Sequence, residues 1–174
     1  MFTAADYEAL NFDTLPLKPG TKNPAVTGWQ RRKPARMWED APHNSNIGIR
    51  TGGGLAVLDC DEKTIPGTFE RAVSWLAGLG YLPGDYPLIQ TASGIGRHVY
   101  LSFTGSLEGA YHILSSDFGA GEFRHGPGAY VVAPPSVITG AGTYSLLTGD
   151  FRQLPNIKTQ DILPIISTQA QSSE

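Results

Sequence analysis

Two carboxylates at the end of an apolar run, Asp59 and Asp61, are the residues whose spacing most clearly suggests chemistry. The run at 54–58 is short, β-prone and begins at a glycine, which predicts a buried strand. Alternate residues of a strand share a face and lie about 7 Å apart, so both carboxylates would project together while Cys60 turns away. Adjacent carboxylates repel each other, and a divalent cation such as Mg2+, which takes oxygen ligands, would relieve that repulsion. A solvated turn after a strand is the alternative interpretation.

Two further strand-like segments carry polar side chains that could meet these carboxylates. A strand that starts at Arg97, directly after a glycine-rich turn, places His98 on the opposite face from Arg97. A later short strand places Glu122 and Arg124 together on one face. A histidine at such a position can meet a ligand, although a lone histidine is often structural.

These groups together favour metal-assisted nucleotidyl transfer. Three carboxylates, Asp59, Asp61 and Glu122, can hold two divalent ions about 3.5–4 Å apart, and such ions activate an attacking hydroxyl and neutralise a leaving pyrophosphate. A histidine and arginines beside them would bind triphosphate oxygens, because the arginine fork binds phosphate with two hydrogen bonds. The sequence contains no Gly-x-Ser-x-Gly nucleophile elbow, so serine-based hydrolysis has no comparable support.

The rest of the sequence predicts the elements that would position these side chains. A capping box predicts a helix over residues 3–10, and prolines and glycines predict a loop over 18–36. The segment 46–50 is predicted to form a hairpin with the strand that ends at Asp59. A helix is also predicted over 66–80 and a short one around 107–114, with strands at 12–17, 87–91, 97–103, 121–125, 129–133 and 143–147. The pattern is lost after Pro155, and 167–174 is predicted to be frayed or a linker.

Composition favours a single domain with many turns. The chain has 174 residues, of which 40% are hydrophobic and 17% charged, as in a globular protein with its own core. Its 21 glycines and 13 prolines favour short strands over a helical bundle. The single cysteine excludes an intramolecular disulfide and favours a reducing compartment. The cysteine and the four histidines do not have the spacing of zinc ligands. With no signal peptide or apolar run of transmembrane length, we expect a cytoplasmic protein without a membrane partner.

Basic residues are concentrated near the start of a chain whose net charge is −3. Between Thr14 and Trp38 there are six lysines and arginines and no acidic residue. A local basic surface can bind phosphates even on an acidic molecule, so we expect 18–36 to contact nucleic acid. A solvated loop is the alternative. Trp29 and Trp38 either anchor this loop to the core, which we favour, or stack on a base.

A series of short motifs occurs in a fixed order between residues 15 and 147. They are PLKPGTKNP at 16–24, GW at 28–29, NIGI at 46–49, TG at 51–52, DCD at 59–61, TASG at 91–94, GRHVY at 96–100, EFR at 122–124 and GAYVVAPPS at 128–136. No single motif is specific, but the whole set resembles the bifunctional primase–polymerase (Prim-Pol) domain of the archaeo-eukaryotic primase superfamily, often found in phage and plasmid replication proteins.

The resemblance implies three catalytic motifs. Asp59 and Asp61 match the Asp-x-Asp motif. His98 matches the histidine of a Ser-x-His motif, and Glu122 stands where the family has a metal-ligating Asp. These four residues would be catalytic, and the three carboxylates would bind Mg2+ or Mn2+ in a two-metal site. The incoming nucleoside triphosphate would be bound by Ser93, Gly94, Arg97, His98 and Arg124.

Two positions depart from the family pattern. Gly96 stands where the second motif often has Ser, so Ser93 is expected to supply the hydroxyl contact to phosphate. Glu122 replaces the usual Asp, which keeps the charge and moves the carboxylate by one methylene. We expect activity to survive both departures.

The resemblance also implies an α+β fold, in which an RRM-like catalytic β-sheet packs with an N-terminal α/β module and the active site lies in the cleft between them. We expect a catalytic domain over 1–160 and a polar tail or linker over 161–174. The expected function is that of a DNA primase/polymerase, which joins nucleoside triphosphates on single-stranded template and primer. Helical and helicase domains would follow in the full-length protein. Two alternatives stay open: a degenerate module that binds nucleotide or primer–template, and a metal-dependent phosphohydrolase or nuclease.

Overall fold

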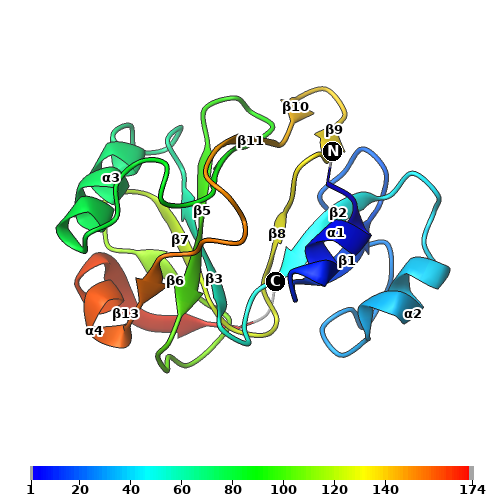
Figure 1. Ribbon diagram of the computed structural model, residues 1–174, viewed down its shortest axis with the longest axis horizontal. Coiled ribbons are helices and arrows are strands. Elements are labelled where there is room, and N and C mark those ends of the chain that lie inside the picture. Colours follow the sequence, from blue (N-terminus) through cyan, green and yellow to red (C-terminus); the bar gives the residue numbers. More distant parts are fainter. Residues whose placement is uncertain (1, 173–174) are drawn as a thin grey trace.

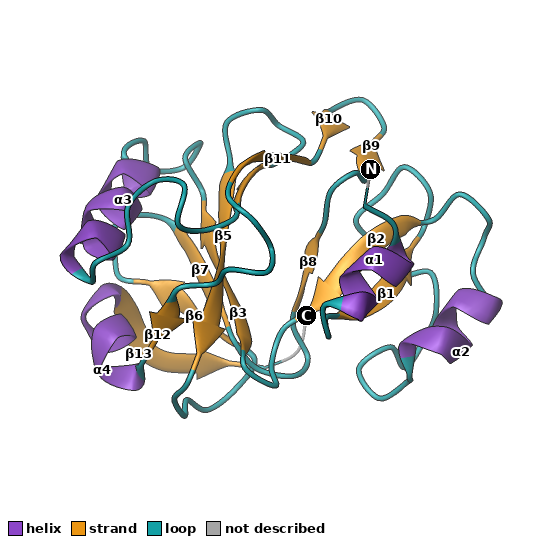
Figure 2. Ribbon diagram, viewed as in Figure 1, coloured by secondary structure: helices purple, strands orange, loops and turns teal. Residues whose placement is uncertain are grey.

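Two sheets, one large and one small, organise the chain in the computed structural model, which describes residues 2–172 (Figures 1 and 2). The large sheet has eight strands, and all its pairings are antiparallel except one. In order across the sheet, its strands are β11 (Ser145–Thr148), β4 (Leu88–Gln90), β5 (Arg97–Phe103), β3 (Leu55–Cys60), β7 (Gly121–Arg124), β6 (Tyr111–Leu114) and β13 (Ile166–Gln171), while β12 (Asn156–Ile157) pairs with β5 in parallel.

The small sheet is antiparallel and draws its strands from distant parts of the sequence. Its order is β1 (Asp13–Leu17), β2 (Asn46–Arg50) and β8 (Tyr130–Val132), and a two-stranded ribbon of β9 (Val137–Ile138) and β10 (Gly142–Thr143) follows. The helices are α1 (Ala4–Ala9), α2 (Pro34–Glu39), α3 (Thr68–Gly78) and α4 (Thr159–Ile162), and a 3-10 turn, η1 (Leu163–Ile165), follows α4. The fold is therefore mixed α/β with mostly antiparallel sheet and few helices, while the RRM-like arrangement stays a prediction.

Strand β3 lies inside the large sheet and is apolar on both faces. Ala56, Leu58 and Cys60 point toward the side covered by α3 and α4 and belong to one buried cluster (Figure 2). Val57 belongs to a second cluster, which fills the space between the large and small sheets. Burial on both faces explains the unbroken apolar run before Asp59. Cys60 is turned away from the carboxylates, as predicted.

Aromatic side chains join α1 and the small sheet to the large sheet. Tyr7 of α1 is fully buried, and its hydroxyl donates to the carbonyl of Pro134 at 2.6 Å. Its ring contacts those of Phe12 and Phe151, and Phe151 in turn contacts Tyr100 of β5. Because these rings come from both sheets and from the connecting loops, their contacts fix how the two sheets face each other.

Several predicted elements are confirmed. The capping box forms at Thr3 and Asp6, and β5 has the predicted bounds. The helix predicted over 66–80 is α3, and Gly80, with a φ of 96°, lies just beyond its end. Both tryptophans near the basic segment have the favoured core role, since Trp29 is 5% exposed and Trp38 packs against the same buried cluster.

The predicted hairpin between 46–50 and the strand ending at Asp59 is wrong. β2 pairs with β1 and β8 in the small sheet, whereas β3 pairs with β5 and β7 in the large one. Gly52, Gly53 and Gly54 all have positive φ, and the turn they form carries the chain from one sheet to the other. Apolar side chains on both strands cannot show which partner each will take, because any neighbouring strand could bury them.

Two other expectations are wrong for the described residues. The short helix expected around 107–114 is instead β6, which begins at Tyr111. The polar segment expected over 161–174 forms the end of α4, η1 and β13, and β13 pairs with β6; residues 173–174 lie outside the described part. β13 is an edge strand that buries little beyond Ile166, so it lacks the alternating pattern that would have predicted it. The loop expected over 18–36 holds until Pro34, which begins α2.

Within residues 2–172, no helix is both long enough and apolar enough to cross a membrane.

Gly121 is required where β7 meets β3. Its φ is 131°, and a Cβ atom there would overlap the carbonyl oxygen of Asp59 in the neighbouring strand. We expect Gly121→Ala to lower the free energy of unfolding by more than about 2 kcal/mol, because backbone cannot yield as a flexible side chain does. Gly78→Ala is the control, because its Cβ would meet nothing and alanine favours helix by up to about 1 kcal/mol. Similar urea midpoints for the two variants would contradict this account.

The protein should become less stable as the pH is lowered, because of a buried histidine pair. His112 and His125 are 3% and 6% exposed, and their ring nitrogens Nδ1 and Nε2 lie 2.9 Å apart. Burial lowers the pKa of His112; burial and then His112 lower the pKa of His125 to about 4. Below the ordinary histidine pKa of 6.5, these two histidines bind protons in the unfolded chain but stay neutral in the folded chain. Stability is therefore lost as the pH falls from about 6.5 toward 4.

The measurement is the urea midpoint between pH 8 and pH 4. His125→Gln should flatten the profile in that window, while His43→Gln, a change at an exposed histidine, should leave its slope unchanged. A slope that survives in His125→Gln would show that other groups cause it.

Candidate functional site

Strand register places a row of polar side chains across the middle of the large sheet. Asp59 of β3 is directly opposite His98 of β5 on one side and Glu122 of β7 on the other. Cross-strand neighbours have Cβ atoms about 4.5–5.5 Å apart and share a face. The predicted meeting of these three residues is thus produced by register, although they are far apart in sequence.

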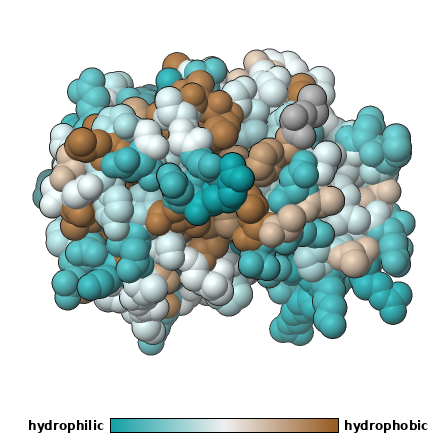
Figure 3. Space-filling view, viewed as in Figure 1, coloured by the Kyte–Doolittle hydropathy of each residue, from teal (hydrophilic) through white to brown (hydrophobic). Residues whose placement is uncertain are grey.

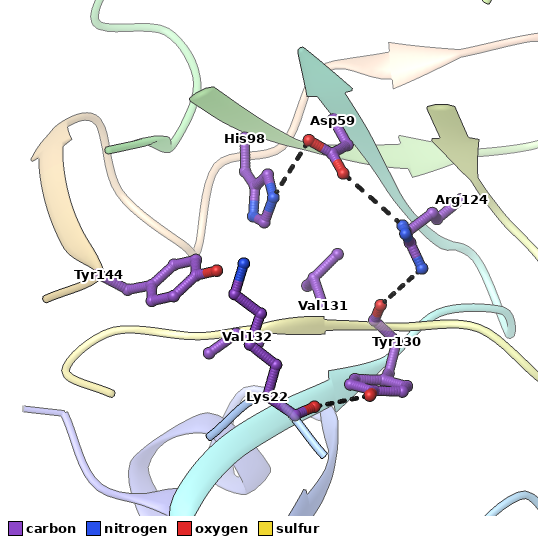
Figure 4. Close-up of a pocket in the computed structure, with 8 residues that line it drawn as sticks. All are labelled: Lys22, Asp59, His98, Arg124, Tyr130, Val131, Val132 and Tyr144. Carbon is purple, nitrogen blue, oxygen red and sulfur yellow. Dashed lines mark hydrogen bonds and ion pairs between the residues drawn. The ribbon is translucent and has the colours of Figure 1, made fainter. Parts of the chain in front are cut away.

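Asp59 is a carboxylate that faces the side chains of His98 and Arg124, with Lys22 in the same pocket (Figure 4). Its oxygens lie 3.4 Å from Nε2 of His98 and 3.9 Å from Nε of Arg124, and its side chain is only 26% exposed. Burial alone would raise the pKa of Asp59, but His98, Arg124 and Lys22 together outweigh burial and hold the pKa below its ordinary value. Asp59 therefore carries its charge at neutral pH.

Arg124 connects the large sheet to the small one. Its Nη2 lies 2.7 Å from Oε2 of Glu122, and its Nη1 donates to the carbonyl of Tyr130 in β8 at 3.1 Å. Its guanidinium also lies 5.5 Å from the ring centre of Tyr111, within the range of a cation–π contact. Because it contacts both carboxylates of the polar row and the backbone of β8, Arg124 is held on several sides.

A pocket of about 250 Å³ lies between the polar row and β8. Figure 4 shows the amino group of Lys22 and the hydroxyl of Tyr144 pointing toward the same space as His98. The Nδ1 atom of His98 is buried and has no hydrogen-bond partner within residues 2–172. Burial, and next the charge of Asp59, raise the pKa of Tyr144 to about 12, so its hydroxyl keeps its proton and can donate. The pocket thus offers two cations, the hydroxyl of Tyr144 and the buried ring nitrogen Nδ1 of His98 to a ligand.

A second pocket, of about 400 Å³, shares Lys22, Asp59, His98 and Tyr144 with the first. Asp61 and Glu122 line it, so it holds the predicted carboxylates. Asp61 accepts hydrogen bonds from the backbone nitrogen of Thr64 at 3.1 Å and from its hydroxyl at 2.7 Å. Lys63, Ser93, Gly96 and the exposed side chains of Ile95 and Ile113 are among the other residues that line this second pocket.

Most of the predicted site residues are brought together, but two are not. Arg97 lies on the opposite face of the sheet, where its Nη1 donates to the carbonyls of Gly94 and Gly96 at 3.2 and 3.0 Å. Arg97 and Gly94 line a different depression beside Phe69 of α3. The nucleotide-binding role expected for these two residues therefore has no support from the geometry, because alternation along β5 separates Arg97 from His98.

Ser93 lines the second pocket, as its expected role requires, while Gly96 leaves little room for a side chain. A Cβ atom at Gly96 would overlap the hydroxyl oxygen of Thr91. The hydroxyl of Ser93 lies 3.3 Å from both the nitrogen of Gly96 and the hydroxyl of Thr91. Ser93 therefore places a hydroxyl in this turn, where a side chain at position 96 would overlap Thr91.

Three residues of the first pocket that carry polar side-chain atoms were not singled out as site residues from the sequence: Lys22, Tyr130 and Tyr144. Lys22 lies in the basic segment, whose expected ligand was nucleic acid in general. The hydroxyl of Tyr130 donates to the carbonyl of Lys22 at 2.7 Å and so helps to fix the loop that carries it. Tyr144 lies in a segment predicted only as a strand, and tertiary pairing of β11 with β4 brings its neighbourhood to the site.

The carboxylates suit a divalent cation by their chemistry but do not form a finished site. Asp59, Asp61 and Glu122 line one pocket and offer the hard oxygen donors that Mg2+ and Mn2+ prefer. Within residues 2–172, however, no three acidic, histidine or cysteine side chains cluster closely enough to hold a metal ion. Glu122 is paired with Arg124 and Asp61 with Thr64. Two-metal binding therefore stays a prediction.

Comparison with known families agrees with the resemblance seen in the motifs. Residues 4–157 match the Prim-Pol family, described as the N-terminal part of the bifunctional DNA primase/polymerase. The matched range runs from α1 to β12 and contains every residue of the polar row and both pockets. A search of curated proteins finds no match. Since the family match covers most of its 174 residues, the chain belongs to the Prim-Pol family.

Proposed function

We propose that this chain is the catalytic domain of a DNA primase/polymerase, which transfers nucleotides from (d)NTPs to a primer on single-stranded template. Family membership supports the general activity, that of a nucleotidyltransferase. The observation that carries the proposal is the ionised carboxylate of Asp59, held between His98 and Glu122 and facing Lys22 across a pocket. This arrangement combines a ligand for a cation with donors for phosphate in one place.

The triphosphate of the incoming nucleotide would bind in the first pocket. Lys22, Arg124 and the buried Nδ1 of His98 offer positive charge or hydrogen bonds, and Tyr144 adds a neutral donor. Charge-assisted hydrogen bonds to phosphate are short and strong, and Val131 and Val132 line the same pocket with apolar side chains. These groups would orient the triphosphate for attack on its α-phosphate and stabilise the leaving pyrophosphate.

Asp59, Asp61 and Glu122 would hold the divalent cation, Mg2+ or Mn2+. When bound, such a cation neutralises charge on the phosphates and lowers the pKa of the attacking hydroxyl. Arg124 already neutralises Glu122 in this structure, so a cation and Arg124 would compete for that carboxylate. Arg124 already lines the first pocket. Once released from Glu122, it would turn toward the negative charge of a triphosphate bound there.

The second pocket would receive the end of the primer. It extends beyond Asp59 on the side of Asp61 and Glu122, and Ile95 and Ile113 are 49% and 47% exposed at its walls. Isoleucine side chains exposed beside carboxylates provide an apolar surface for a sugar or base, while Ser93 provides a hydroxyl. The primer hydroxyl and the triphosphate would then meet at Asp59, which both pockets share.

Asp59→Asn keeps the size of the side chain and removes its charge. We expect primer extension with dNTPs to fall by at least about a hundredfold in Mg2+ and in Mn2+, because the central carboxylate is lost. Nucleotide binding without metal should persist or strengthen, because a negative charge beside the triphosphate is gone. Asp150→Asn, at a residue paired with Arg152 outside both pockets, should extend primers normally. Full metal-dependent extension by Asp59→Asn would exclude the proposed role.

Lys22→Ala should weaken use of the incoming nucleotide. Loss of a charged donor to phosphate corresponds to a rise of roughly 10-fold or more in KM for dNTP, with a smaller change in kcat. Lys22→Arg should recover part of the loss because it keeps the charge. The exposed Lys18, in the same basic segment but lining neither pocket, provides the control variant Lys18→Ala. An unchanged KM in Lys22→Ala would remove Lys22 from the nucleotide site.

One observation favours a second candidate function. Because Glu122 is paired with Arg124 and no three-carboxylate cluster exists within residues 2–172, a module that binds nucleotide or primer–template without chemistry is also consistent with the geometry. Nucleotide binding without incorporation in either metal would select this candidate. The same extension assay would show a nuclease as shortening of the labelled primer.

A further inference from the structure

A third pocket, which we call the basic pocket, lies between the loop before α2 and the turn after β2. It has a volume of about 390 Å³ and shares no residue with the two pockets of the polar row. Four cationic side chains and one carboxylate line it: Arg31, Arg32, Lys33, Arg50 and Asp13. The basic pocket therefore concentrates positive charge in a chain whose net charge is −3. Hydrophilic side chains gather on the neighbouring surface over α2 (Figure 3).

Arg50 builds the wall of the basic pocket. Its side chain is 12% exposed, and its Nη1 donates to the carbonyls of Trp29 and Arg32 at 2.8 and 2.7 Å. Its Nη2 lies 3.8 Å from the carboxylate of Asp13, and its Nε is buried without a hydrogen-bond partner within residues 2–172. Arg50 thus holds the loop in place, and the carboxylate beside it is no closer than 3.8 Å.

Two of the cations remain available to a ligand. Arg32 is paired with Asp40 at 2.6 Å, whereas the exposed side chains of Arg31 and Lys33 make no ion pair in the described part of the chain. Opposite them, Gly53 has a φ of 62°, and a Cβ atom there would meet nothing. A ligand can therefore approach this turn closely. Exposed cations facing open backbone favour a phosphate group as the ligand.

The basic pocket begins directly beside the first pocket of the polar row. Arg50 pairs with Tyr130 across β2 and β8, and such neighbours have Cα atoms about 4.5–5.5 Å apart. Tyr130 lines the first pocket, and its ring contacts that of Trp29 at 5.1 Å between centres. The two pockets are thus neighbours, because Arg50 lines one and its strand partner Tyr130 lines the other. A single nucleotide in one of them leaves the other open, whereas a strand with repeated phosphates can occupy both.

We propose that the basic pocket binds backbone phosphates of single-stranded DNA that extends from the polar row. This inference rests on the proposed function for the direction of the strand, but binding itself requires no catalysis. Arg31 and Lys33 would contact the phosphates, and Arg50 would act as a positioning residue that holds their loop. The contacts would be independent of base sequence, because phosphates carry no sequence information.

The test is binding of a fluorescein-labelled single-stranded oligonucleotide to the whole chain, without metal or nucleotide, measured by anisotropy over a series of salt concentrations. The double variant Arg31→Gln/Lys33→Gln should bind about tenfold or more weakly at low salt. The slope of log K against log salt should become shallower by about 1.4, because each phosphate contact to a single strand contributes about 0.7. Circular dichroism and urea midpoints would show that the variant folds.

The matched control is Lys18→Gln/Arg36→Gln, which removes the same charge from the same basic segment at exposed residues outside the basic pocket. The slope of log K against log salt for this variant should stay within about 0.3 of the slope for the original chain, because Lys18 and Arg36 would make no phosphate contact in the basic pocket. Equal losses in the two double variants, or no loss in either, would overturn the proposal.

Two further arms distinguish phosphate binding in the basic pocket from nucleotide binding there and from catalysis. Binding of a fluorescent dNTP should be the same in Arg31→Gln/Lys33→Gln as in the original chain; its loss would instead make the basic pocket a nucleotide site and overturn the proposal. The oligonucleotide series is then repeated in the Asp59→Asn background. A retained slope difference there would support phosphate binding even if primer extension never occurs, so this inference and the proposed function can fail separately.

Discussion

A negative charge held in a confined place is the constraint on which the rest of the site depends. Asp59 stands between two other strands, where burial works against its ionised form. Three polar side chains, from β5, β7 and the loop after β1, reverse that cost. Each of these groups must therefore be held near the carboxylate, so the electrostatics of one residue impose positions on parts of the fold that are distant in sequence.

The contacts that satisfy Asp59 also connect the two sheets. Arg124 reaches from the polar row to the carbonyl of Tyr130, and Tyr130 reaches on to the loop that carries Lys22. The ring of Tyr130 then packs on Trp29, whose carbonyl is held by Arg50. One series of polar and aromatic contacts thus runs from the carboxylate of Asp59 to the basic pocket. A ligand that moved Arg124 would therefore move a residue that is connected both to Asp59 and to the basic pocket.

The predictability of this fold from sequence follows from the range of the interactions. Helix α3 and strand β5 carry local signals, periodicity and turn glycines, and were predicted with near-correct bounds. β6 and β13 were not predicted, since their pairing with each other supplies a stability that neither sequence shows alone. The false hairpin before β3 has the same cause, because apolar strands of similar length do not specify their partner.

The candidate site divides in the same way. Asp59, Asp61, His98 and Glu122 were identified because strand alternation and motif order are visible in the sequence. Arg97 could be placed on the opposite face from His98 by alternation alone, and the structure confirms that separation. Tyr144 could not be found, because its neighbouring strand reaches the site only through the pairing of β11 with β4. Local geometry thus predicts which face a residue takes, but not what stands opposite it.

The interleaving of the two sheets along the chain has a consequence for how this protein is made. β1 and β2 belong to the small sheet, but their partner β8 is synthesised only after most of the large sheet. The large sheet in turn is completed only when β13 has been made and pairs with the edge strand β6. The small sheet cannot be completed until β8 has been made, and long loops must close before their contacts stabilise anything. The polar row lies on β3, β5 and β7, but Arg124 reaches its backbone partner only when β8 has been made, so the site should be assembled after most strands of both sheets.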